Sequence, residues 1–161
     1  MEFIKRLESR SPVYLEQYRS SIIDRFSNVG KTGDEGVYKA GKTFHRVYEV
    51  YMYALIVGLR KDYKLPLPAG GKTVPFIEIK IWQPREVVEF IIASLIARSD
   101  IDFNAIEDMD EKEVEEEITK LKKLMEEYAH GGFELLERAI NEDSYRFDND
   151  DKAFIDFLDE L

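Results

Sequence analysis

Residues 43–60 constrain the fold more than any other segment, because their apolar side chains recur at helical spacing around most of the circumference. A helix that is apolar nearly all round is usually buried, so we expect a central buried helix over residues 43–60. The longest apolar run in it, residues 51–59, is far too short to span a bilayer. The apolar positions are Phe44, Val47, Tyr48, Tyr51, Met52, Leu55, Ile56 and Leu59.

Two further helices are expected on either side of the central one. Ser11 followed by Pro12 is typical of an N-cap and first helical position, and predicts a helix that continues to about Phe26. Gln83–Pro84 opens a second helix, which runs to about Arg98 with its valines, isoleucines and leucine facing inward. Between these helices, residues 74–82 alternate in the manner of one short strand or extended piece.

The last third of the chain predicts a long amphipathic helix and a corner. Asp110 with Glu113 is a capping-box variant, and apolar residues then recur at alternating spacings of four and three. Two glycines interrupt this pattern in C-cap fashion, so we expect a tight helix–helix corner there. A shorter helix would follow it. The corner residues are Tyr128, Gly131, Gly132 and Phe133.

These elements predict one mainly α domain over residues 1–161, with about six helices and at most one short β element near residues 74–82. A glycine-rich basic loop is expected at residues 27–42. Residues 143–161 are an acidic extension that contains an amphipathic helix. Its apolar side is a candidate to dock a partner, with packing on the chain's own domain as the open alternative, and consists of Phe154, Phe157, Leu158 and Leu161.

The absence of cysteine excludes a disulfide framework, a zinc–thiolate site and a cysteine nucleophile, and it fits a reducing cytoplasm. The charged first ten residues do not resemble a signal peptide. The two histidines, His45 and His130, have no metal-ligand spacing, so we expect no metal and no cofactor. The acidic runs lack the spaced ligands and the glycine of a calcium-binding loop, which favours a solvated surface.

Charge is divided unevenly along the chain. Residues 1–98 carry 16 Lys/Arg and 11 Asp/Glu, a balance of +5, whereas residues 99–161 carry 7 and 22, a balance of −15. Such polarity suggests a charged partner, or else a solubilising acidic surface. The basic residues of the first half are candidate contacts for nucleic acid or a partner protein. They are Arg25, Lys31, Lys39, Lys42, Arg46, Arg60, Lys61 and Lys64.

Residues 36–43, GVYKAGKT, match the P-loop pattern G-x-x-x-x-G-K-[ST]. A P-loop needs a buried strand before the glycines and a second strand ending in an acid to hold magnesium. The polar, glycine-rich residues 27–35 predict no such strand, so a mobile basic loop is the favoured interpretation.

Glu78-x-Lys80 matches half of a metal-dependent nuclease core, with Asp62 upstream as a third group. That core needs a multi-stranded sheet, and the sequence predicts a single strand. A plain ion pair between Glu78 and Lys80 on one strand face is the alternative.

Two segments resemble a known family. Residues 51–67 combine an apolar helix ending in Ala-x-x-x-Gly-Leu with a basic turn and Pro-Leu, and residues 124–140 contain Glu-Glu-Tyr-Ala, a polar residue and Gly-Gly before an apolar helix. In this order, over about residues 43–141, they resemble small accessory proteins associated with bacterial DNA phosphorothioation (Dnd-type) anti-phage systems. The glycine-rich insert and the acidic extension depart from that pattern.

The resemblance implies a cytoplasmic bacterial protein that works with DNA modification or restriction machinery, and it supplies no catalytic residues. Our hypothesis is a non-enzymatic accessory or adaptor protein that assembles with a larger protein of the same system or with itself, without membrane association. The alternative is a DNA-binding module that uses basic residues 25–64. A P-loop NTPase and an E-x-K nuclease are less favoured.

Overall fold

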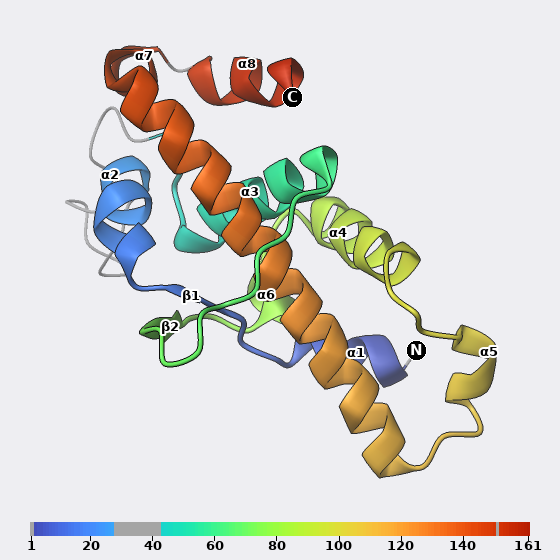
Figure 1. Ribbon diagram of the computed structural model, residues 1–161. Coiled ribbons are helices and arrows are strands. Elements are labelled where there is room, and N and C mark those ends of the chain that lie inside the picture. Colours follow the sequence, from blue (N-terminus) through green and yellow to red (C-terminus); the bar gives the residue numbers. More distant parts are fainter. Residues whose placement is uncertain (1, 28–42, 151) are drawn as a thin grey trace.

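The structure is a computed structural model that describes residues 2–27, 43–150 and 152–161. The long helix α6 (Glu111–Glu142) runs across the whole molecule, and α3 (Val47–Lys61) crosses it (Figure 1). The expected mainly α fold is confirmed. The remaining elements are α1 (Glu2–Glu8), β1 (Val13–Leu15), η1 (Arg19–Ile23, a π-helix), α2 (Asp24–Phe26), β2 (Thr73–Pro75), η3 (Ile79–Ile81, a 3-10 helix), α4 (Arg85–Ala97), α5 (Phe103–Ile106), α7 (Ser144–Asn149) and α8 (Ala153–Glu160).

The central helix is confirmed as α3, although it begins at Val47 rather than at residue 43. Its start is fixed by Glu49, whose carboxylate accepts hydrogen bonds from the backbone N–H groups of His45 (2.7 Å) and Arg46 (3.4 Å). Such a bond satisfies donors that a helix start leaves without an intrahelical partner. Residues 50–55 and 57–59 are buried, so α3 is enclosed on most sides as its composition predicts.

The predicted start of the long helix is confirmed, and its predicted end is wrong. Asp110 and Glu113 form the expected reciprocal capping box, with bonds of 2.8 and 2.9 Å. The helix then continues through Gly131 and Gly132 to Glu142. Tyr128, Gly131, Gly132 and Phe133 therefore form no corner, and all four are buried within one helix.

The glycines serve a close crossing of α3 and α6 instead of a helix end. A Cβ atom added to Gly132 would lie 1.7 Å from the carbonyl oxygen of Ala54 on α3. In the reverse direction, a Cβ atom on Gly58 of α3 would lie 2.1 Å from the carbonyl oxygen of Tyr128 on α6. Only glycine lets the two backbones approach this closely.

Of the helix predicted from Ser11 to about Phe26, the second part is confirmed as η1 and α2, and the start is wrong, because the segment after Ser11 contains β1, which pairs antiparallel with β2. Side chains from the two central helices hold β1 in place. The Val13 N–H donates to Glu126 Oε2 at 2.8 Å, and the Val13 carbonyl accepts from the Tyr51 hydroxyl at 3.1 Å. An extended backbone thereby gains partners that a helix would have supplied internally. The β element expected at residues 74–82 is present only as the short strand β2. It is followed by η3 and by the fully buried Trp82.

None of the helices in the described ranges combines the length and the hydropathy that a bilayer crossing requires.

Buried tyrosine hydroxyl groups predict a loss of stability at alkaline pH. Burial raises the pKa of Tyr18 to about 12, and burial also raises the pKa values of Tyr51 and Tyr53. A folded pKa above the unfolded one contributes stability that is complete below the unfolded pKa of about 10 and is lost as pH rises beyond it. The reason is that the unfolded chain releases these protons first.

We therefore expect cooperative unfolding above about pH 10, in which tyrosinate absorbance and circular dichroism change with one midpoint. Ionisation of most of the nine tyrosines before any loss of helix signal would contradict this expectation.

Candidate interaction surface

Four cationic side chains gather where α3 ends and the chain turns along α6. Three of them, Arg60, Lys61 and Lys64, belong to the predicted contact set and are exposed. The fourth, Arg98, follows α4 and donates from Nη2 to the carbonyl oxygen of Leu59 at 3.3 Å. We call Arg60, Lys61, Lys64 and Arg98 the cationic turn.

The backbone of this turn is held firmly. Asp62 has φ 50° and caps α3 in the left-handed region, with its N–H directed at the carbonyl oxygens of Gly58 and Leu59. Its carboxylate accepts a hydrogen bond from the Tyr128 hydroxyl at 2.9 Å. Three residues after Asp62, the Leu65 N–H donates to the carbonyl oxygen of Glu127 at 3.0 Å. Bonds from two points of the turn to α6 therefore present the cationic side chains from a fixed position.

Gly131 completes this attachment. A Cβ atom on Gly131 would lie 2.1 Å from the carbonyl oxygen of Tyr63, so the turn lies directly on the α6 backbone. His130 Nδ1 lies 3.2 Å from the carbonyl oxygen of Leu65. The Ala-x-x-x-Gly-Leu and Tyr-Ala-His-Gly-Gly motifs thus meet in space, where together they form the helix crossing and support the turn.

Most of the positive charges of the cationic turn are not paired with a carboxylate of the described residues. Arg98 Nε lies 3.8 Å from Asp62 Oδ1, whereas Arg60, Lys61 and Lys64 make no ion pair within the part of the chain that the structure describes. Lys64 Nζ lies 5.9 Å from the centre of the Tyr128 ring, at cation–π distance. Burial, followed by the bond to Asp62, raises the pKa of Tyr128, so its hydroxyl stays a donor. Arg60 and Lys61 interact favourably with the C-terminal end of α3, which explains part of their placement.

Two of the other predicted basic contacts, Arg25 and Arg46, do not join this surface. Arg25 donates from Nε to Asp148 Oδ1 at 3.0 Å and thereby connects α2 to α7. Arg46 is exposed at the opposite end of α3, about 20 Å along the helix axis from Arg60. The remaining three, Lys31, Lys39 and Lys42, lie outside the described residues.

The apolar side of the C-terminal helix, predicted to dock a partner, packs on this chain's own core. Phe154 is 2% exposed and lies 5.0 to 5.4 Å, between ring centroids, from four aromatic rings. Phe157 is also buried, and Leu158 and Leu161 pack partly buried against the same core. The neighbouring aromatic residues offer α8 an apolar surface within the chain, and docking of a partner by this helix stays a prediction. Those rings belong to Phe26, Phe44, Tyr53 and Phe147.

The enzyme motifs gain no structural support among the described residues. Of the P-loop match only Thr43 is described, and each of the two strands in the described ranges has three residues. Lys80 Nζ lies 2.8 Å from Glu78 Oε2, which is the plain ion pair given above as the alternative. Within the described ranges, no group of three or more His, Cys, Asp or Glu side chains is arranged so that it could hold a metal ion.

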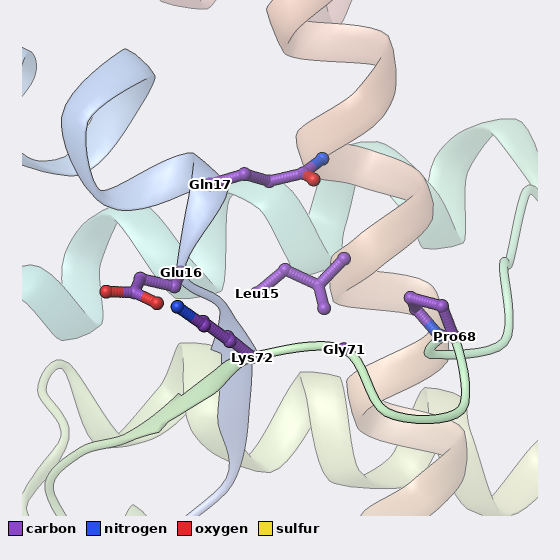
Figure 2. A pocket seen from close by; sticks show the side chains of 6 residues that line it. All are labelled: Leu15, Glu16, Gln17, Pro68, Gly71 and Lys72. Carbon is purple, nitrogen blue, oxygen red and sulfur yellow. The ribbon is translucent and has the colours of Figure 1, made fainter.

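A pocket of about 340 Å³ lies between β1 and the loop that leads into β2. Figure 2 shows Leu15 pointing between the two segments, with Glu16 and Lys72 on one side and Pro68 on the other. The backbone N–H of Glu16 donates to the carbonyl oxygen of Lys72 at 2.9 Å, which joins the two segments that line the pocket. Its described lining offers an acid, an amide and an ammonium group but no nucleophile–base pair, so we assign it no chemistry.

Sequence reasoning missed Arg98 and the anchoring role of Asp62. Arg98 was expected only as the end of a helix, and nothing in its neighbourhood in sequence points to α3. Asp62 directly follows a helix that ends in two cations, which is a signal for a C-cap. The tertiary contact between Asp62 and Tyr128 was not predictable from spacing.

Comparison with known proteins supports the family resemblance. A family model described as DNA sulphur modification system-associated protein 4 matches residues 36–155, which is 120 of the 161 residues. The match reaches beyond residues 43–141 on both sides, so it includes part of the glycine-rich loop and much of the acidic extension. No curated protein and no solved structure matches the chain.

Proposed function

Since the chain belongs to the family of DNA sulphur modification system-associated protein 4, we propose that it is a non-enzymatic adaptor of a bacterial anti-phage defence system. It assembles with a larger protein of that system through the cationic turn. The single observation that supports this is a fixed turn with three cations that lack ion pairs among the described residues, in a chain of net charge −10. The partner surface that fits it is rich in Asp and Glu.

A protein partner is favoured over DNA for two reasons. The cationic turn offers at most four positive charges, whereas duplex-binding proteins commonly neutralise about 6 to 10 phosphates. The exposed carboxylate of Asp62 lies within the turn, and residues 99–161 add a balance of −15 that repels a polyanion. An acidic partner protein, unlike the uniformly charged DNA backbone, can have a side chain without negative charge at the point that faces Asp62.

Charge reversal of the turn tests the proposal. In the variant R60E/K61E/K64E, we expect the complex with purified proteins of the same defence system to weaken at least about tenfold, because attraction becomes repulsion at the contact. Binding is measured by calorimetry or interferometry at two salt concentrations. The wild-type complex should weaken as salt rises, since exposed charges are screened.

The matched control is K72E/K112E/K152E, which reverses three exposed lysines elsewhere and changes the net charge by the same six units. Equal weakening in the control would show that total charge, rather than this surface, determines binding. If instead the isolated chain binds DNA at about 50 mM salt, with a log–log salt slope near −3 that the turn variant abolishes, the DNA-binding alternative replaces the adaptor proposal.

A further inference from the structure

Helix α4 has apolar side chains on its outer face as well as on its inner one. Val88, Ile91, Ile92 and Leu95 are buried against the core. On the opposite side, Phe90 is 60% exposed, and Ala93 and Ala97 are also exposed. Phe90, Ala93 and Ala97 follow spacings of three and four, which is the pattern of a helix-pairing seam. We call these three residues the outer seam.

A groove of about 440 Å³ runs beside the outer seam, between α1 and α4. Its apolar lining comes from Ile4, Ile92, Ala93 and Ile96. Arg85, at the start of α4, forms an ion pair with Glu8, at the end of α1. The two helices therefore run in opposite directions along the groove.

Two exposed side chains of opposite charge lie along this groove. Glu89 lies on the N-terminal half of α4, and Lys5 lies one turn before Glu8, toward the C-terminal half of α4. Within the described ranges neither makes an ion pair. The groove thus has a negative end at Glu89 and a positive end at Lys5, and no ion pair within the described ranges neutralises either charge.

We propose that the outer seam is a homodimer interface in which α4 packs antiparallel on α4 of a second copy. If the two-fold axis is perpendicular to the helices and passes between Ala93 and Ser94, position 90 of one copy faces position 97 of the other. The large Phe90 ring then meets the small Ala97 side chain twice, once on each side of the axis. A two-fold interface requires this kind of self-complementary surface.

Charge supports the same arrangement. Because the axis reverses the direction of the groove, Glu89 of one copy faces the end where Lys5 of the second copy lies. A parallel pair would instead bring Phe90 against Phe90 and place the two grooves on opposite sides of the interface, which loses the shape complementarity and the approach of Glu89 to Lys5. One 13-residue helix is about 20 Å long, so we expect a small interface and a weak dimer.

This inference does not depend on the proposed function, since the outer seam and the cationic turn are different surfaces with different variants. The chain has no cysteine, which permits a direct test by single introduced cysteines. We expect the Ala93→Cys variant to form an intermolecular disulfide under mild oxidation, because position 93 lies next to the axis. The Ala97→Cys variant should cross-link far more slowly. In the antiparallel pair, the two copies of position 97 lie about 10 Å further apart along the helix direction than the two copies of position 93.

Sedimentation equilibrium supplies the second readout. We expect the wild type to dimerise and Phe90→Glu to raise the dimer dissociation constant at least about tenfold. Ile155→Glu, the same kind of substitution at a residue that is 63% exposed on α8, should leave it unchanged. Lys5→Glu should weaken the dimer, and the double variant K5E/E89K should restore it.

Three results would overturn the inference. One is a monomer at about 200 µM, where even weak interfaces associate. Another is a dimer that Phe90→Glu does not weaken. The third is faster cross-linking at position 97 than at position 93.

Discussion

Replacing Gly132 with alanine is expected to destabilise the protein by at least about 3 kcal/mol, the upper range for overpacking. The new Cβ atom would lie 1.7 Å from the carbonyl oxygen and 2.5 Å from the carbonyl carbon of Ala54. These are backbone atoms in the middle of α3, so they cannot move aside as a flexible side chain can. Relief requires α3 and α6 to separate, which loosens contacts along the whole crossing. Urea unfolding followed by circular dichroism measures the loss.

Gly70→Ala is the matched control for this prediction. Gly70 has φ +76° and nothing within 4 Å of an added Cβ atom, so the substitution adds backbone strain without a clash. We expect a cost of about 1 kcal/mol there. If both variants lose the same stability, the close approach of α3 and α6 at Gly132 is not what makes glycine necessary.

Phe154→Ala is expected to cost about 3 to 5 kcal/mol, as is typical when a buried phenylalanine is truncated. Its ring lies edge-to-face against Phe26, Phe44, Tyr53 and Phe147, with interplanar angles of 71 to 80°. Its backbone carbonyl also accepts a 2.6 Å hydrogen bond from the Tyr53 hydroxyl. Removal of the ring leaves a cavity among groups that are fixed by other contacts. Thermal and urea unfolding of the isolated protein measure the effect.

The adjacent Ile155, 63% exposed, provides the comparison. Ile155→Ala should change stability by less than about 0.5 kcal/mol, the usual range for surface positions. A Phe154→Ala variant as stable as Ile155→Ala would mean that α8 does not pack on this chain in solution. The earlier expectation of α8 as a partner-docking helix would then regain support.

The parts of the fold that sequence predicted are those set by local chemistry. The all-round apolar pattern of residues 43–60 predicted a buried helix, and the Asp110–Glu113 box predicted the start of α6 to the residue. Both signals act over a few residues, so no tertiary information was needed. The cations of residues 60–64 are exposed in the structure, and their contact with a partner stays a prediction.

The errors occurred where tertiary contacts override local preference. Gly131 and Gly132 are typical of a helix end, yet here they are required by the proximity of Ala54 and Tyr63, which are far away in sequence. Ser11 and Pro12 are typical of a helix start, yet Glu126 and Tyr51 bind the Val13 backbone in extended form. Arg98 belongs to the cationic turn only because α4 ends beside α3. The spacing of residues in the sequence does not reveal such contacts.

The hydrogen bonds from α3 and α6 to the Val13 backbone also show that the segment matched by the family model differs from the part of the chain that folds as a unit. Residues 2–27 precede the matched segment 36–155, yet they contribute Phe3, Leu7 and Tyr18 to the same core, and Arg6 and Arg10 form ion pairs with Glu115. A fragment cut to the family boundaries would expose these partners and leave the Glu126 carboxylate without its Val13 donor. We expect such a fragment to be unable to fold cooperatively, and we expect the smallest stable piece of this chain to be longer than the segment that matches the family model.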